Sequence, residues 1–152
     1  MTTAEAFTRI ASKCTTTELC LEDARNRLER TDLTDDERQS VLNRLVDEKF
    51  IDESRYARAF AHDKLRFNGW GRIKISQALR LKHISSVFID EALGEIDDEI
   101  CLEVLRPLLV SKRRTVHGNN DYEVDAKLTR FALSRGFEYA LIRQCLDTLK
   151  EE

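Results

Sequence analysis

Apolar residues recur along the whole chain at intervals of three and four positions, the spacing that places side chains on one face of an α-helix. Leu21, Ala24 and Leu28 form one such stripe. With 1 Pro and 5 Gly, the chain has fewer turn-forming residues than a sandwich or barrel with many tight hairpins would need. The pattern therefore predicts an all-α protein of about nine short helices, the first near residues 4–13.

Polar residues predict where some of these helices begin or break. Thr15 with Glu18, and Thr34 with Glu37, have the spacing of a capping box, in which the two side chains bind free backbone amides at a helix start. Pro107 falls well inside another expected helix. Because proline lacks an amide hydrogen, we expect it to kink or split that helix.

The helical pattern itself repeats about every fifty residues. At an offset of 53, Ile84 meets Phe137 and Ile89 meets Ile142; at an offset of 51, Leu33 meets Ile84. Few residues are identical, so the evidence for the repeat lies in the matched apolar positions.

The repeat predicts three tandem units of three helices within a single elongated domain spanning residues 1–152. The unit boundaries fall at about residues 4–49, 50–96 and 97–150. The third unit is longer, and its extra residues are placed at 117–121, a stretch rich in Gly and Asn. Because each unit contacts mainly its neighbours, the molecule should be solenoid-like, a shape typical of binding surfaces.

Composition narrows the classes of function. Charged residues make up 35% of the chain, yet 25 Lys and Arg nearly cancel 28 Asp and Glu, leaving a net charge of −3. That balance does not predict tight nonspecific binding to DNA. The chain begins without a secretory signal and has no apolar run of transmembrane length, so we expect a cytoplasmic protein without membrane contact.

No catalytic, metal or cofactor site emerges from the residue types that usually form one. The histidines lack ligand spacing, the glycines lack the phosphate-loop pattern, and the carboxylates fall at helix starts or on polar faces. We therefore expect a noncatalytic protein without cofactor or metal. The scattered cysteines form no C-x-x-C pair and are expected to be small buried hydrophobes: Cys14, Cys20, Cys101 and Cys145.

Three stretches in the middle of the chain form a family signature. They are LVDEKFIDESRYARAF at 45–60, NGWGRI at 68–73 and LRLKHI at 79–84. In order and spacing they resemble the RecX regulatory family, whose implied fold is three tandem three-helix units. One departure is His83, where the family commonly has a glycine that adopts a left-handed conformation; Gly136 keeps that glycine in the third unit.

The resemblance implies a noncatalytic modulator, mainly an inhibitor, of the RecA recombinase. Members of the family bind in the groove of the RecA filament on single-stranded DNA and suppress ATP hydrolysis, strand exchange and coprotease activity. A partner that touches several protomers can inhibit in this way without chemistry of its own. The resemblance thus implies the filament as the partner. We expect the protein to be a monomer and any direct contact with DNA to be weak.

Charge is unevenly distributed along the chain. Residues 64–89 hold six basic residues and no acidic one, whereas residues 90–103 hold seven acidic residues and no basic one. A basic face can neutralise phosphates or meet an acidic protein surface. Arg55 and Arg58, which precede this basic stretch, rank second to its six cations. The candidate partner- or DNA-binding residues are thus Arg55, Arg58, Lys64, Arg66, Arg72, Lys74, Arg80 and Lys82.

Other interpretations of these residues remain open. Any one of the cations can belong to a solvated helix face, and Arg55 and Arg58 can form surface ion pairs. Trp70 could stack on a base, although a tryptophan between two glycines more often fills the joint between two helices. The alternative function is a standalone nucleic-acid-binding helical protein, which the net charge of −3 disfavours.

Overall fold

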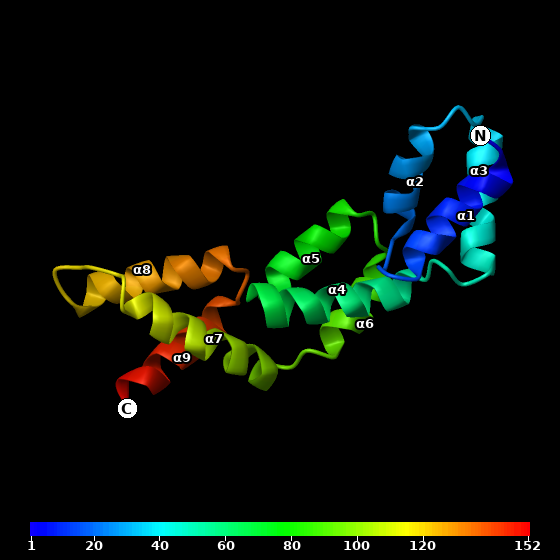
Figure 1. The fold of residues 1–152 in the computed structure, drawn as a ribbon. Helices are drawn as coiled ribbons and strands as arrows, with labels where there is room; N and C mark the ends of the chain where they lie inside the picture. The colour runs from blue at the N-terminus through cyan, green and yellow to red at the C-terminus, as the bar shows by residue number, and fades with distance from the viewer.

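The computed structural model describes all 152 residues and contains helices but no strand, which confirms the all-α prediction. Nine helices follow one another along the chain (Figure 1). They are α1 (Thr3–Cys14), α2 (Leu21–Glu29), α3 (Asp35–Asp47), α4 (Glu53–Asn68), α5 (Arg72–Leu81), α6 (Ser86–Gly94), α7 (Asp98–Arg113), α8 (Asp121–Ser134) and α9 (Tyr139–Lys150). None of them is both long and apolar enough to cross a bilayer.

The helices are grouped in threes along a bent rod. In Figure 1, α7–α9 and α4–α6 lie end to end, and α1–α3 turn away from that axis, with the two termini at opposite ends of the molecule. We call these groups the first (α1–α3), second (α4–α6) and third (α7–α9) units. Tandem three-helix units are thus confirmed, whereas the boundaries at 4–49, 50–96 and 97–150 stay predictions.

Equivalent apolar positions explain why the three units fold alike. Leu33, Ile84 and Phe137 each follow the second helix of their unit, and they are only 4%, 5% and 0% exposed. Burying a large aliphatic or aromatic side chain stabilises the fold by about 2 kcal/mol. Each unit is therefore held together by an apolar residue in the turn between its second and third helices.

The two expected capping boxes have different outcomes. The Thr34 hydroxyl accepts the Glu37 amide at 3.2 Å, and the Glu37 carboxylate accepts the Thr34 amide at 2.9 Å, so this box is confirmed at the start of α3. The box predicted at Thr15 and Glu18 is wrong. Thr15 is the C-cap of α1, which ends at Cys14, and α2 begins only at Leu21.

Pro107 does not split its helix, because α7 continues without interruption from Asp98 to Arg113. The proline lies on the exposed side of α7. Glu103, four residues earlier, is exposed as well, so the carbonyl that loses its amide partner can be hydrated. Because the proline is exposed, it destabilises this helix less than a buried proline would.

The turn after α5 keeps the left-handed conformation that a glycine would favour, although its residue is His83. His83 has a φ of 60° and Gly136 a φ of 91°, so the two equivalent turns share the backbone device expected from the sequence. The third unit differs elsewhere. Residues 114–120 link α7 to α8, against residues 69–71 between α4 and α5, and α8 has 14 residues against 10 in α5.

The interior consists of two hydrophobic clusters rather than one. One cluster of 12 buried residues lies in the first unit and the link that follows it, while a cluster of 21 runs through the second and third units and also includes Cys20 from the first unit. Cys20, Cys101 and Cys145 are buried free thiols, as expected, but Cys14 is only half-buried. The second and third units therefore share a core from which the first unit is largely separate.

Candidate functional site

The backbones of the second and third units meet directly where α5 begins. The Gly71 amide donates to the Arg135 carbonyl at 2.7 Å, and the Ile73 amide donates to the Gly136 carbonyl at 3.0 Å. A Cβ on Gly71 would lie 2.4 Å from the Gly136 carbonyl oxygen, and a Cβ on Gly136 would lie 2.4 Å from the Lys74 Cβ. Only glycine at both positions allows this close approach.

Arg72 fixes the same joint with its side chain. Its guanidinium donates to the Glu138 carboxylate at 2.7 and 3.3 Å, to the Asp98 carboxylate at 2.6 Å and to the Ile96 carbonyl at 3.0 Å. The hydrogen bond to Glu138 contributes most to raising the Arg72 pKa above its usual value. With its side chain 23% exposed, Arg72 is mainly an internal link between two units.

Every polar contact between the first and second units involves at least one side chain. The Lys82 ammonium donates to the Asp23 carboxylate at 2.6 Å, and the Arg55 guanidinium donates to the Glu18 carboxylate at 2.7 Å. No backbone hydrogen bond joins these units. The polar part of this joint therefore consists largely of ion pairs between partly exposed groups, which salt screens.

The pKa values in this joint reflect pairing and burial. The hydrogen bond to Asp23 raises the pKa of Lys82. Burial tends to raise the pKa of Asp23, but the hydrogen bonds from Lys82 and from the Cys20 amide together hold it below its ordinary value. Burial raises the pKa of Glu53, whose carboxylate accepts the Leu21 amide across the joint at 3.2 Å.

Lys64 and Lys74 come together over Trp70. Their ammonium groups lie 4.9 and 4.6 Å from the centre of the indole ring, within the range of cation–π attraction. The ring also packs edge-on against Phe60, with centroids 6.3 Å apart. Trp70 thus lies half-buried between α4 and α5 with two cations already on it, the arrangement of a residue that fills a joint.

Three of the eight candidate cations remain exposed with no carboxylate partner: Arg58, Arg66 and Arg80. Arg58 donates to the Ser54 hydroxyl at 2.8 Å, and the other two form no hydrogen bond or ion pair. They lie on α4 and α5 of the second unit. These arginines are therefore the part of the expected basic surface that is free to meet a partner.

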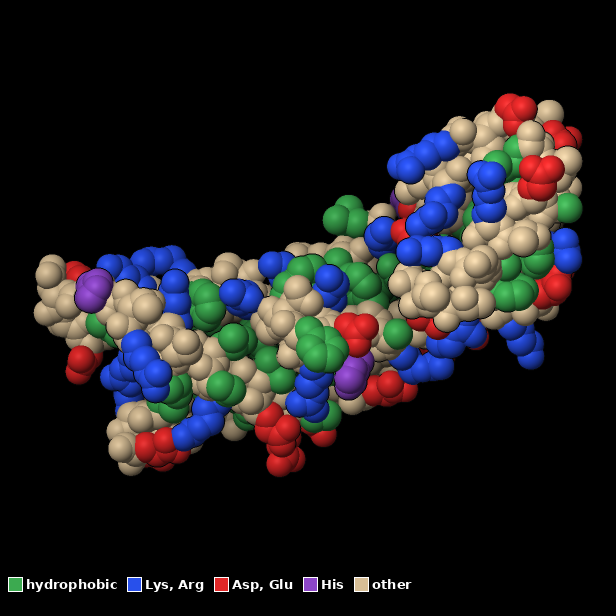
Figure 2. Space-filling view, viewed as in Figure 1, with side chains coloured by type: hydrophobic (Ala, Val, Ile, Leu, Met, Phe, Trp, Pro, Cys, Tyr) green, Lys and Arg blue, Asp and Glu red, His purple; other side chains and the backbone are tan.

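Basic charge is not confined to the middle of the molecule. Figure 2 shows lysine and arginine side chains over all three units on the visible face.

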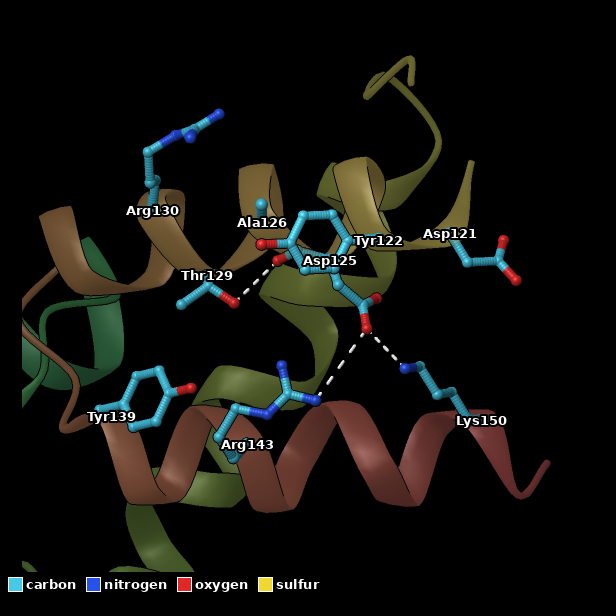
Figure 3. A pocket seen from close by; sticks show the side chains of 9 residues that line it. All are labelled: Asp121, Tyr122, Asp125, Ala126, Thr129, Arg130, Tyr139, Arg143 and Lys150. Carbon is cyan, nitrogen blue, oxygen red and sulfur yellow. Dashed lines mark hydrogen bonds and ion pairs between the residues drawn. The ribbon is translucent and has the colours of Figure 1, made fainter. Parts of the chain in front are cut away.

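A groove between α8 and α9 in the third unit was not predicted from the sequence. Tyr122 and Tyr139 lie there near Arg130 and Arg143 (Figure 3). Two aromatic residues spaced along separate helices give no sequence motif, so only the fold could bring them together.

Comparisons with known proteins decide the family. Residues 52–93 match the model of the second three-helix domain of RecX, and residues 98–146 match that of the third. The regulatory protein RecX of Prosthecochloris aestuarii is 30% identical over 129 residues, covering 84% of this chain and 82% of its own length. The chain belongs to the RecX family. The resemblance noted in the sequence is therefore confirmed, and the relatives' name agrees with the expectation of a noncatalytic protein.

Other RecX proteins extend beyond the matched region. RecX of Clostridium botulinum strain Eklund 17B is 32% identical over 129 residues, which cover 84% of this chain but 58% of that protein. The share of the relative falls to 42% for RecX of Bacillus cytotoxicus. This member of the family thus spans about half the length of several curated relatives that it matches.

Solved structures share the whole fold of this RecX-family chain. The crystal structure of RecX from Lactobacillus salivarius has a TM-score of 0.88 at 17% identity, covering 99% of this chain and 97% of that one. A second crystal structure of regulatory protein RecX has a TM-score of 0.86 at 21% identity. The three-unit architecture therefore persists although most residues differ.

Proposed function

We propose that this protein is a noncatalytic regulator of the RecA recombinase that binds the RecA filament on single-stranded DNA. In this proposal it acts mainly as an inhibitor, suppressing ATP hydrolysis, strand exchange and coprotease activity. The observation that carries the proposal is membership of the RecX family, matched by family models across the second and third units.

The shape of the molecule supports a filament as the partner. Three units in a bent row present a long surface for their size, which suits contact with more than one subunit of a helical polymer (Figure 1). Such a ligand needs no catalytic group. It shifts the filament between states by as much as its affinities for those states differ.

The free cations of the second unit are the contact we propose for the filament. Arg58, Arg66 and Arg80 are exposed and make no ion pair within the chain, so an acidic partner surface would not have to displace an internal carboxylate. Arg55, Arg72 and Lys82 are less suited to this role, because each already binds a carboxylate across a joint. Lys64 and Lys74 remain candidates through their exposed edges around Trp70.

The test is the RecA ATPase on single-stranded DNA, with RecA from the same organism and this protein added in substoichiometric amounts. Inhibition well below one molecule per RecA supports a regulator acting on the filament. Absence of any effect up to equimolar amounts would remove the filament as the partner.

A matched pair of triple variants tests the surface. Neutralising the three arginines of the second unit (Arg58→Gln, Arg66→Gln, Arg80→Gln) should raise the half-inhibitory concentration about tenfold or more, since lost charge complementarity slows association. The control neutralises three exposed, unpaired arginines of the first unit: Arg9, Arg27 and Arg30. Equal effects of the two triples would contradict the proposed surface.

Direct binding to bare DNA is the competing explanation for any effect on the filament. A salt titration separates the two, because binding to phosphates falls steeply with salt whereas binding that requires assembled RecA is absent with DNA alone. The net charge of −3 and the two ammonium groups on Trp70 favour the filament as the main partner.

A further inference from the structure

Three arginines line one pocket of the first unit. Arg9 comes from the middle of α1, Arg27 comes from the last turn of α2, and Arg30 caps the end of that helix (Figure 1). The pocket has a volume of about 260 Å³ and is open to solvent. Three more of its lining residues belong to the buried core: Ala6, Ile10 and Leu28. The pocket thus has an apolar floor and three cations around it.

No carboxylate of the chain neutralises these arginines. Their side chains are exposed and form no hydrogen bond or ion pair. Glu5, one turn before Arg9 on α1, does not pair with it. Asp32 binds the Met1 ammonium at 3.5 Å, and Glu29 lines a different pocket, between α2 and α3. An anion that binds among the three arginines is therefore attracted by all of them and displaces no internal partner.

The position of Arg9 argues against a purely local role for the three cations. Arg27 and Arg30 lie at the C-terminal end of α2, where a positive charge interacts favourably with the helix dipole. Arg9 lies in the middle of α1 and gains nothing from a helix end. The fold of the first unit therefore brings together cations from two separate helices, and the helix dipole explains only two of them.

We propose that this pocket binds a small anion with two linked phosphate groups, as in inorganic pyrophosphate or the phosphate tail of a free nucleotide. A guanidinium presents its donors in a planar fork that matches two phosphate oxygens. At a charge of about −1.5 per phosphate group, two groups carry about −3 at neutral pH, which balances three arginines. The volume of about 260 Å³ lies just below the usual range of small-molecule sites, roughly 300–1,000 Å³, so a compact ligand fits best.

A nucleic-acid strand matches this pocket less well than a diphosphate. Its backbone carries a single negative charge per phosphate, so one phosphate cannot balance three arginines. The pocket also lies outside the residues matched by the RecX models, 52–93 and 98–146. It is on a different unit from the filament contact proposed above, for which the same three arginines are the charge control. The anion site is therefore independent of the proposed function.

The experiment is a calorimetric titration of the full chain with inorganic pyrophosphate, at low ionic strength and without divalent cations. We expect saturable binding at one site per chain and a melting temperature that rises with pyrophosphate concentration. Arg9→Gln, Arg27→Gln and Arg30→Gln should each weaken binding about tenfold or more, because each removes a charged hydrogen bond to phosphate. Arg9→Lys keeps the charge but not the fork, and should weaken binding less than Arg9→Gln.

The matched control is Arg113→Gln in the last turn of α7. Arg113 is exposed, forms no ion pair and has basic neighbours in Lys112 and Arg114, as the arginines of the pocket have one another. It should leave pyrophosphate affinity unchanged. Urea midpoints of all the variants should stay within about 0.5 kcal/mol of the native value, since the replaced side chains are exposed.

Other anions identify the part of the ligand that is recognised. Orthophosphate should bind at least tenfold more weakly than pyrophosphate, because it offers one phosphate group instead of two. Adenosine diphosphate that binds as tightly as pyrophosphate, or more tightly, would assign the site to the phosphate tail of a nucleotide. Weaker binding of adenosine diphosphate would assign it to free pyrophosphate.

Three results would overturn the proposal. They are the absence of saturable binding up to millimolar pyrophosphate, native affinity in the three glutamine variants, and orthophosphate or oligothymidylate binding as tightly as pyrophosphate. The last result would show that the arginines recognise any phosphate, including that of a nucleic-acid backbone. The titration contains no RecA, so the ATPase assay decides the fate of the proposed function separately.

Discussion

Replacing Arg72 by alanine tests whether this cation holds the second and third units together or serves a partner. Its guanidinium makes two hydrogen bonds to Glu138, one to Asp98 and one to the Ile96 carbonyl. If the side chain is a structural link, Arg72→Ala should destabilise the protein even when no partner is present.

The magnitude follows from the exposure of each partner. Asp98 is 68% exposed, so its ion pair contributes at most about 1 kcal/mol. Glu138 is 31% exposed and bound through both oxygens, and charged hydrogen bonds of this kind contribute about 1.5–3 kcal/mol. Removing the positive charge from the first residue of α5 stabilises the variant by about 0.5 kcal/mol, because that charge opposes the helix dipole. We expect a net loss of about 2 kcal/mol.

Urea denaturation followed by helical circular dichroism measures this loss as a lower midpoint with an unchanged slope. Arg80→Ala on the same helix is the control, and should change stability by less than about 0.5 kcal/mol because Arg80 is exposed and unpaired. A double-mutant cycle with Glu138→Ala should give a coupling of about 1 kcal/mol or more. Equal stabilities of the Arg72→Ala and Arg80→Ala variants would refute the structural role.

Three further predictions concern pH and the turns. Burial raises the pKa of Cys20 and Cys101 to about 11, whereas an unfolded thiol ionises near 9.0. Each thiol stabilises the fold while it stays neutral. This contribution to the free energy of unfolding is complete below pH 9 and is lost between pH 9 and 11, so it should fall by about 1 kcal/mol per thiol by pH 10. Urea midpoints at pH 8 and 10 measure this loss, and a Cys101→Ala variant should show a smaller drop; an identical drop would contradict the assignment. His83→Gly should stabilise the chain by about 0.5 kcal/mol, because His83 holds a φ of 60° that glycine adopts without strain. Gly136→Ala should cost about 3 kcal/mol in the same denaturation assay, since its Cβ would lie 2.4 Å from that of Lys74, and a milder loss would show that the joint can open.

Local pattern was sufficient to predict most of the fold. The apolar positions that match across the repeat, such as Leu33, Ile84 and Phe137, are buried as their spacing indicated. The capping motif predicted helix starts less reliably. Thr15 and Glu18 have the same spacing as Thr34 and Glu37, yet only the second pair forms a capping box. Glu18 instead pairs with Arg55, 37 residues away. A short motif cannot reveal when a distant side chain competes for one of its members.

The candidate surface was harder to predict for the same reason. Lys82 and its partner Asp23 are 59 positions apart, and Arg72 and Glu138 are 66 apart. A run of basic residues without acids looks free along the sequence, yet neighbouring units supply the missing carboxylates. Exposed cations and joint cations can be separated only when the packing of the units is known.

The two joints give the molecule two kinds of mechanical coupling. The second and third units are joined by backbone-to-backbone hydrogen bonds at Gly71 and Gly136, whereas every polar contact between the first and second units involves a side chain. On the filament proposed above, such a molecule would act as a bivalent ligand, in which the second and third units bind as one stiff body and the first unit binds as a tethered second one. If the proposed filament is the partner, the covalent link would hold a detached first unit at an effective concentration on the order of millimolar, so that it would rebind before the other two units leave. A long residence time then needs no single strong contact.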